Sequence, residues 1–432
     1  MTSPDSDVLI AGAGPAGLSL AIALSQAGFT ATVVEQLPAA TLAAPPPDGR
    51  EIALTHPSRA TLQRLGSWGA LAPHEVGEIH EAQVHDGPLG QHGALQLSAP
   101  GPAAAAHASG SGSPAAQPLG FIVPNHALRR SAWAVAQRMP GVRILTGAQV
   151  TRVSTHGPLA ALDYMADGES GAQRLHAPLL VAADSRFSAT RRQLGLGAQM
   201  TDFGRTVIVC RMRHAQPHGN VAHECFGYER TLAVLPLPDD PEHGHALCSV
   251  VVTAGAADAA ALMALDPAAF AAQVQAQFSN RLGPMALVGE RHAYPLVAVY
   301  ADRFAAHRCA LLGDAAVGMH PVTAHGYNLG LAGVERLVAA LVAARRQGQD
   351  IGAADVLAGY ARTHHRHAWP IYQGTNAIVR LYTDARPVPR LLRQLVLQGA
   401  RRLPPLQAAI VGQLTGKPPG WARWAAGPAA LR

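Results

Sequence analysis

A glycine-rich turn between an apolar strand and a helix constrains the fold of this chain more than any other feature. Residues 7–11 predict a short buried strand, and residues 15–27 predict a helix. Between them stand Gly12, Gly14 and Gly17, in the spacing GxGxxG. The first glycine permits a tight turn, the second lets a pyrophosphate approach the backbone, and the third lets helix and strand pack closely. The motif therefore predicts a dinucleotide at the helix N-terminus, where free N–H groups favour an anion.

A second strand and an acidic residue complete this unit. Residues 30–35 are rich in β-branched side chains and predict a strand, so the βαβ crossover should be right-handed. Glu35 ends that strand, where a carboxylate can hydrogen-bond an adenosine ribose. The span from Val8 to Val34 has no charged residue and is long enough to cross a bilayer. Its glycines, Pro15 and the polar Ser25-Gln26 pair favour a soluble unit instead.

Composition excludes several other classes of protein. The 432 residues are 48% hydrophobic and 14% charged, which excludes a disordered chain. The net charge of +6 is scattered and aromatic residues make up 5%, so we expect no nucleic-acid partner. Four distant cysteines without a CxxC pair, and histidines without an HExxH motif, predict no metal site. The N-terminus lacks a secretory signal, and we expect a cytoplasmic protein.

A second motif, at residues 310–330, favours a flavin over a nicotinamide. Gly313 and Asp314 follow a predicted buried strand, which places the carboxylate to bond a ribityl hydroxyl group. A helix beginning near Gly326 would direct positive potential at the flavin N1–C2=O edge and stabilise the anionic reduced ring. The alternative is that Asp314 only caps a helix.

These motifs resemble those of the class A flavoprotein monooxygenases, over residues 5–370. The family has an N-terminal GxGxxG, a central DG region and a late GD region. The central region corresponds here to residues 182–191, with Asp184 present and Ser185 where the family usually has glycine. The resemblance implies FAD as cofactor, NAD(P)H or another electron donor as reductant, and O2 activated as a flavin C4a-hydroperoxide.

The resemblance also implies further cofactor contacts. Arg50, in an Arg-x-Ile-Ala-Leu context, matches an arginine that the family places beside the cofactor. Asn125 and Arg129, at the start of a predicted helix, match another cofactor-contacting segment. The full predicted cofactor set is Gly12, Gly14, Gly17, Glu35, Arg50, Asn125, Arg129, Asp184, Gly313, Asp314, Gly326, Tyr327 and Asn328.

Within the class, the chain is similar to the ubiquinone-biosynthesis hydroxylases. Residues 50–56, 184–188 and 320–326 look like the UbiM subgroup, the 5-demethoxyubiquinol hydroxylases. The resemblance implies ring hydroxylation of a polyprenyl quinol precursor, with other ubiquinone-biosynthesis proteins as partners. It also places His56 and His325 near the flavin. We interpret His325 as the candidate catalytic residue, which would bias the ring hydroxyl toward phenolate; the alternative is a hydrogen-bonded pocket wall.

The predicted fold is α/β. A Rossmann-like FAD-binding domain with a mixed sheet is interleaved with an antiparallel-sheet substrate domain and followed by C-terminal helices. The FAD-binding parts are residues 1–75, 119–200 and 300–370; the substrate domain is 76–118, with a flexible loop at 98–118, and 201–299; the helical tail is 371–432.

Two other functions stay open from the sequence. The chain could be a degradative phenol or aromatic-acid hydroxylase, which would need a cationic anchor for a carboxylate. It could also be a catalytically silent FAD-binding scaffold of a lipid-biosynthesis complex. Uncoupled and product-coupled NAD(P)H oxidation would separate these functions.

The tail carries an amphipathic pattern at residues 386–402. At 100° per residue, apolar side chains gather on one broad face and arginines on the other. The apolar face holds Leu391, Leu392, Leu395 and Val396, and the basic face holds Arg390, Arg393 and Arg401. The helix either docks on the flavin domain or rests on anionic inner-membrane lipid.

Overall fold

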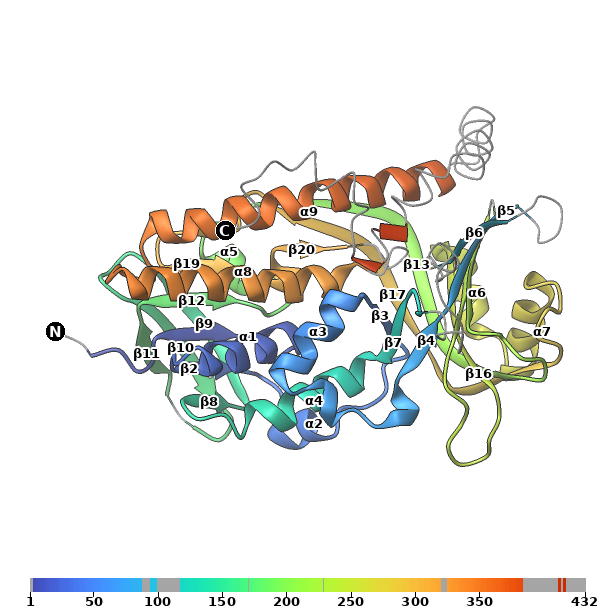
Figure 1. The fold of residues 1–432 in the computed structure, drawn as a ribbon, viewed down its shortest axis with the longest axis horizontal. Helices are drawn as coiled ribbons and strands as arrows, with labels where there is room; N and C mark the ends of the chain where they lie inside the picture. Colours follow the sequence, from blue (N-terminus) through green and yellow to red (C-terminus); the bar gives the residue numbers. More distant parts are fainter. Residues whose placement is uncertain are drawn as a thin grey trace, which may run out of the picture.

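The structure is a computed structural model, which describes residues 3–87, 94–98, 117–169, 171–227, 229–319, 325–383, 411–412 and 415–416. Two bodies lie side by side, one built on a parallel sheet and the other on a larger, mostly antiparallel sheet (Figure 1). The predicted α/β fold class is therefore confirmed. The flexible loop predicted at 98–118 and the tail helix predicted at 386–402 fall almost wholly outside the described residues.

The parallel sheet has the strand order β18-β19-β12-β1-β2-β8. Its strands are β1 (Val8–Ala11), β2 (Ala31–Val34), β8 (Val142–Leu145), β12 (Leu179–Ala182), β18 (Ala305–Ala306) and β19 (Cys309–Leu311). The short β18 is antiparallel to β19, and the other neighbours are parallel. Strands β1, β2, β12 and β19 are buried along their whole length, as expected for a sheet covered on both faces.

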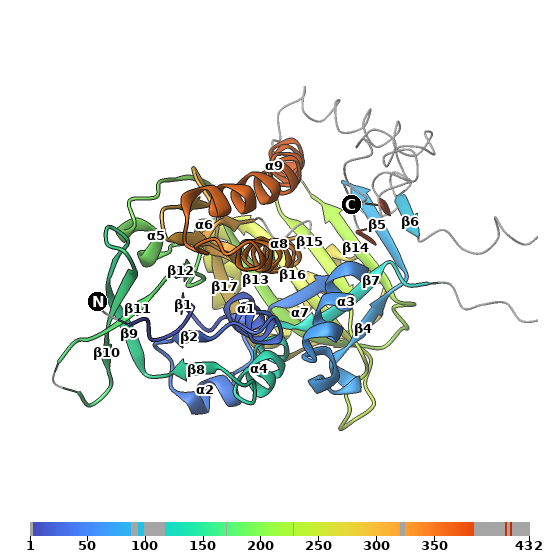
Figure 2. The ribbon, with the colours of Figure 1, turned by 60° about the vertical axis from the view of Figure 1, so that its left-hand side comes forward.

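Helices cover one face of this sheet, with α8 and α9 running along it (Figure 2). They are α1 (Pro15–Gln26), α4 (Asn125–Ala136), α8 (Gly326–Arg346) and α9 (Ala354–Thr383), with short α2 (Ala39–Ala43) and α5 (Ala189–Gln193) nearby. Val8 and Ile10 of β1 share a core with Leu18 of α1. The domain boundary predicted at residue 370 lies inside α9.

A three-stranded antiparallel sheet covers the other face. Its strands are β9 (Ala148–Ser154), β10 (Ala160–Ala166) and β11 (Gln173–Ala177). Leu9 of β1 joins Leu162 of β10 in this second core, because successive residues of a strand point to opposite faces.

The large sheet has the order β20-β17-β13-β16-β15-β14-β5-β6. Its strands are β5 (Glu81–Asp86), β6 (Leu95–Ser98), β13 (Ala198–His214), β14 (Val221–Phe226), β15 (Thr231–Pro236), β16 (Leu247–Gly255), β17 (Met285–Ala301) and β20 (Val317–Gly318). Its neighbours are antiparallel except β14 and β5, which are parallel. Helices α6 (Ala256–Ala264) and α7 (Pro267–Gln277) cover its outer face (Figure 1).

A small sheet connects the two bodies. It contains β3 (Glu51–Leu54), β4 (Gly77–Ile79) and β7 (Gly120–Pro124), in the order β3-β7-β4. Helix α3 (His56–Leu65) and the 3-10 turns η1 (Trp68–Ala70) and η2 (Pro73–Glu75) follow β3 along the chain. Ile79 and Ile122 of the small sheet pack against Leu235 and Leu247 on the inner face of the large sheet. This inner face is therefore turned toward the body that is built on the parallel sheet.

Among the described helices, α8 is long and apolar enough to cross a membrane. Here it packs against α1 and α9.

Candidate active site

The glycine turn after β1 is closed on one side and open on the other. Gly12 has φ +105°, and a Cβ there would lie 2.7 Å from the carbonyl oxygen of Ala183. A Cβ on Gly17 would collide with the carbonyl oxygen of Gly12. Gly14, just before α1, has no neighbouring atom within 4 Å of a built Cβ. The turn is thus tightly packed at Gly12 and Gly17 and open at Gly14, where a pyrophosphate is expected.

Glu35 ties this turn to the end of β2. Its Oε2 accepts a hydrogen bond from the Ala13 N–H at 2.7 Å, and its Oε1 accepts one from the Leu37 N–H at 3.0 Å. A carboxylate has about four acceptor positions, so each oxygen keeps capacity for a ribose hydroxyl. The structure thus gives Glu35 a positioning role; its predicted bond to the adenosine ribose stays a prediction.

Arg50 and Asn125 come together through a carboxylate that the sequence prediction missed. Asp48 Oδ2 accepts from Arg50 Nε at 3.0 Å and from Asn125 Nδ2 at 2.7 Å. Burial would raise the pKa of Asp48, but Arg50 and Asn125 outweigh it and hold the pKa below its usual value. The Arg50 guanidinium also lies 5.5 Å from the ring centre of Tyr294 in β17. The cluster therefore sits at the junction of the two bodies.

Two predicted cofactor residues present buried polar atoms without partners among the described residues. Arg129, on α4, has a buried Nε with no hydrogen bond. Asp184 accepts from the Thr190 N–H through Oδ2 at 3.2 Å, whereas its Oδ1 is buried and unbonded. A buried donor or acceptor without a partner costs about 1–3 kcal/mol, and a bound polar group would remove that cost. The open space at Gly14 and the unbonded Arg129 Nε and Asp184 Oδ1 atoms are therefore compatible with bound FAD, which could accept and donate the missing hydrogen bonds.

Asp314 faces a cation and does not cap α8. It lies in the 3-10 turn η4 (Gly313–Ala315), where Gly313 has φ +60°. Its Oδ2 is 3.2 Å from Arg186 Nη2, and its side chain is 41% exposed. The N-cap position of α8 is taken by His325. The carboxylate is thus accessible to a ribityl hydroxyl group, although Arg186 already engages one oxygen.

The first turn of α8 is fixed by its own side chains. The helix begins at Gly326, as predicted, and a Cβ there would meet no atom within 4 Å. Tyr327 Oη lies 3.2 Å from Ser19 Oγ in α1, and burial raises the Tyr327 pKa to about 12. Asn328 accepts from the Thr55 N–H at 3.0 Å and donates to the Ala53 carbonyl at 2.9 Å. Both predicted cofactor residues therefore position the helix N-terminus.

The two candidate histidines lie in different surroundings. His325 is buried. The pKa of His367 in α9 is lowered to about 4 by desolvation, then by Arg336 and by the charge of His325. His56 Nε2 lies 2.8 Å from the Pro118 carbonyl oxygen, and its ring packs edge-on against Phe121. The catalytic role of His325 stays a prediction, and residues 320–324 before it lie outside the described part.

Sequence reasoning missed two glutamates at the junction of the two bodies, one on the small sheet and one on the inner face of the large sheet. The Glu51 side chain, on β3, is 2% exposed; burial raises its pKa to about 7, even though the paired Arg211 lowers it. Glu224 is in the middle of β14, and desolvation by the surrounding protein raises its pKa to about 8. A charged residue inside an apolar strand is the sequence signal that could have singled out Glu224.

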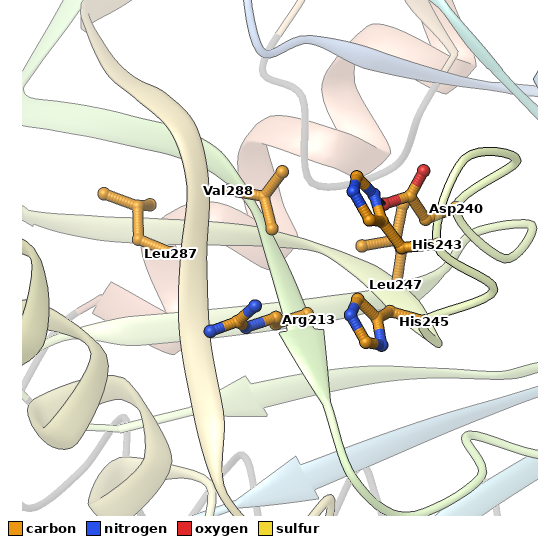
Figure 3. Close-up of a pocket in the computed structure, with 7 residues that line it drawn as sticks. All are labelled: Arg213, Asp240, His243, His245, Leu247, Leu287 and Val288. Carbon is orange, nitrogen blue, oxygen red and sulfur yellow. Dashed lines mark hydrogen bonds and ion pairs between the residues drawn. The ribbon is translucent and has the colours of Figure 1, made fainter.

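A separate pocket of about 260 Å³ lies at the β15–β16 loop (Figure 3). Its lining includes Arg213 on β13, the stacked rings of His243 and His245, and Asp240. Asp240 Oδ2 is 2.9 Å from His243 Nδ1. The pocket contains none of the predicted cofactor residues.

Comparisons with known proteins agree with this geometry. The family described as FAD binding domain matches residues 5–375. Ubiquinone hydroxylase UbiM of Neisseria meningitidis serogroup C is 44% identical over 411 residues, which are 95% of this chain and 85% of that protein. Ubiquinone hydroxylase UbiL of Rhodospirillum rubrum is 33% identical, over 95% of this chain and 90% of its own. The crystal structure of p-nitrophenol 4-monooxygenase PnpA from Pseudomonas putida DLL-E4 has a TM-score of 0.73 at 17% identity, over 96% of this chain and 99% of that chain.

The chain therefore belongs to the FAD binding domain family, and its class is that of the FAD-dependent aromatic-ring monooxygenases. Within that class it is similar to the ubiquinone hydroxylases, with UbiM matching nearly its whole length. The family resemblance seen in the sequence motifs and the predicted FAD cofactor are both confirmed.

Proposed function

We propose that this protein hydroxylates the aromatic ring of a polyprenyl quinol precursor in ubiquinone biosynthesis, with 5-demethoxyubiquinol as the substrate. The observation that carries the proposal is the 44% identity to ubiquinone hydroxylase UbiM over 95% of the chain. A 3-demethoxyubiquinol 3-hydroxylase of Escherichia coli, 25% identical over 93% of this chain, supports the same substrate class.

The nucleotide-binding body holds the cofactor in this proposal. FAD supplies the electron transfer and oxygen activation when it is bound. The turn at Gly14 and the orphaned Arg129 Nε would hold its phosphates, and Glu35 its adenosine ribose. Asp314 would bind the ribityl chain, while the α8 N-terminus at Gly326 directs positive potential at the ring.

The inner face of the large sheet favours a neutral ring over an aromatic acid. Arg211, near the middle of this face, would be a natural anchor for a substrate carboxylate. Its guanidinium is instead paired with Glu51, at 2.7 Å. Leu235, Leu247 and Val288 lie around this pair, and the residue directly opposite Arg211 in the sheet is the small Ser249. A phenol or quinol with a hydrocarbon tail suits such a surface better than a benzoate does.

The proposal also concerns where the protein acts. We infer a cytoplasmic protein that touches the inner membrane peripherally, because a polyprenyl substrate resides in lipid. Other ubiquinone-biosynthesis proteins are the expected partners. The amphipathic pattern of residues 386–402 supports membrane contact by composition.

Turnover with labelled oxygen tests the function. The FAD-loaded protein is mixed with NADH or NADPH, heavy-isotope O2 and either a short-tail demethoxyubiquinol or 4-hydroxybenzoate. The proposal predicts one labelled oxygen in the quinol product, with reductant consumption stimulated by the quinol. Labelling of the benzoate alone would establish a degradative hydroxylase, and substrate-independent oxidation without labelled product would indicate a scaffold. Quinone precursors extracted from a strain lacking the protein would identify the ring position.

A further inference from the structure

The two faces of strand β14 have different neighbours. Cys225 belongs to the apolar core beneath α6 and α7, and the His223 ring packs edge-on against Phe278, which follows α7. Side chains alternate along a strand, so Ala222 and Glu224 point the other way. Ala222 indeed packs with Ile122 of the small sheet. Glu224 therefore lies on the inner face, which is turned toward the nucleotide-binding body (Figure 1).

Small and apolar side chains surround Glu224 on that face. The strand register places Val84 of β5 on one side of it and Ala233 of β15 on the other. The same row continues from Ala233 to Val251 and then to Val209. Because strands are about 4.8 Å apart, Val209 is roughly 14 Å from Glu224 along the row.

The far end of this row touches the predicted cofactor cluster. A Cβ on Gly49 would lie 2.9 Å from Val209 Cγ2. Gly49 stands between Asp48 and Arg50, which form the ion pair described above. The row thus leads from the cofactor side of the inner face to a carboxyl group at the other end, with aliphatic side chains between them.

The Glu224 carboxyl group has no hydrogen bond or ion pair to any residue that the structure describes. The residue as a whole is partly exposed, yet desolvation by the surrounding protein raises the pKa of its carboxyl group to about 8. In the adjacent row Ser249 is fully buried, and its Oγ also has no partner among the described residues. Polar side chains in such surroundings are normally bonded, so two unbonded ones on one face indicate a polar ligand.

We propose that Glu224 binds a ring hydroxyl of the aromatic substrate and accepts its proton, with Ser249 bonding a second ring oxygen. This inference rests on the proposed function, and it identifies Glu224 as the base in the proposed ring hydroxylation. The substrate O–H bond breaks, a carboxyl O–H bond forms, and the electron pair stays on the ring oxygen. No group is oxidised or reduced in this step. The proton returns to an oxygen of the product after hydroxylation.

A desolvated glutamate is a better base for this step than a fully hydrated one. A phenolic hydroxyl has a pKa of about 10, and an ordinary glutamate has a pKa of about 4.3. Desolvation brings the Glu224 pKa to about 8, which narrows the difference to about 2 and makes proton transfer much less unfavourable. The resulting phenolate carries more electron density at the ring carbon that is oxygenated.

Glu224→Gln is the decisive variant, because it keeps the shape and removes the base. Glu290→Gln is the matched control, since Glu290 is exposed on β17 of the same sheet. We expect Glu224→Gln to keep wild-type FAD content and the wild-type rate of flavin reduction measured without quinol, and to form product about 100-fold more slowly. In wild type and the control, the rate of product formation should rise as the pH increases through about 8. In Glu224→Gln this rise should be absent. An unchanged rate and pH profile in Glu224→Gln would overturn the inference.

Two further measurements separate this inference from the proposed function. Wild-type protein that makes no hydroxylated quinol would contradict the proposed function. In that case, flavin fluorescence quenched by the quinol in wild type and not in Glu224→Gln would still support Glu224 as its binding residue, and equal quenching would overturn it. If Glu224→Gln does not fold, Ser249→Ala should lower the share of NAD(P)H coupled to product, and unchanged coupling would count against the site.

Discussion

Glu51 of β3 holds Arg211 of β13 across the junction of the two bodies, with Nε at 2.8 Å and Nη2 at 2.7 Å from the same oxygen, Oε1. The other oxygen, Oε2, is buried and has no partner in the described part of the chain. Burial raises the Glu51 pKa more than Arg211 lowers it, to about 7. The Glu51 carboxyl group, which pairs with Arg211 at the junction of the two bodies, therefore gains or loses its proton near neutral pH.

Glu51→Gln should remove a pH-dependent component of stability. The folded pKa is about 7 and the unfolded value is 4.5, so the folded state binds more protons between these values. The wild-type free energy of unfolding should therefore lose about 3 kcal/mol as pH rises through this window, relative to the variant. Urea unfolding of both proteins, at several pH values from about 5 to 8, measures this difference. If the difference in free energy of unfolding between wild type and Glu51→Gln stays constant with pH, the Glu51 pKa is not raised in the folded state. Glu290→Gln serves as the control at an exposed position.

Gly14→Ala and Gly17→Ala form a matched pair at the glycine turn. Gly14 has φ −67° and open space around a built Cβ, so alanine should leave the melting temperature of the FAD-free protein unchanged. Its methyl group points where the pyrophosphate is expected, and FAD affinity should fall by about tenfold or more. In Gly17→Ala the new methyl group would collide with the Gly12 carbonyl oxygen, so both the melting temperature and the FAD affinity should fall. Thermal melts and FAD titrations measure the two effects; equal behaviour of the variants would refute the proposed cradle.

Asp314→Ala should weaken FAD binding by about 2 kcal/mol through loss of a charge-assisted hydrogen bond. The carboxylate is partly exposed and already faces Arg186, so the ion pair alone contributes little to stability. Fluorescence titration with FAD gives the affinity, and urea unfolding of the FAD-free protein gives the stability. If Asp314→Ala lowers stability and leaves FAD affinity unchanged, the residue serves only its contact with Arg186.

The nucleotide-binding unit could be predicted from the sequence because its signals are local. Gly12, Gly14, Gly17 and Glu35 fall within one strand–turn–helix–strand segment, and α8 begins at Gly326, where the second motif predicts a helix start. For Tyr327 and Asn328, by contrast, the sequence predicts only cofactor contacts. The structure shows that they bond Ser19, Thr55 and Ala53, which lie far away in the sequence and which no local motif indicates.

The inner face of the large sheet could not be predicted in the same way. Glu51 meets Arg211 across 160 residues of sequence, and the neighbour of Glu224 on β5 is Val84, in a parallel pairing. Such pairings depend on register between distant strands, which a single sequence does not specify. Alternation within β14 places Ala222 and Glu224 on one face, but which face is inward follows only from α6 and α7.

His325→Ala should lower product formation more than flavin reduction, because its predicted role concerns the ring substrate. His367→Ala is a suitable control, since this neighbour on α9 lies close enough for the charge of His325 to affect its pKa. Stopped-flow absorbance follows flavin reduction and the later oxidative steps separately. If neither half-reaction changes in His325→Ala, or if both histidine variants behave alike, His325 is a wall of the pocket.

The amphipathic pattern at residues 386–402 predicts salt-sensitive binding to anionic vesicles. Each arginine near such a surface contributes about 1 kcal/mol at moderate salt, and the effect is screened as salt rises. Deleting the tail is a poor test, because Val411 packs against Ile79 and Leu97, and a Cβ on Gly416 would lie 2.8 Å from Pro57. Replacing Arg390, Arg393 and Arg401 with glutamine leaves those contacts in place. Co-sedimentation with anionic and neutral liposomes at low and high salt should show binding by wild type that the triple variant loses; equal binding by both proteins, or none by either, would rule out the interfacial helix.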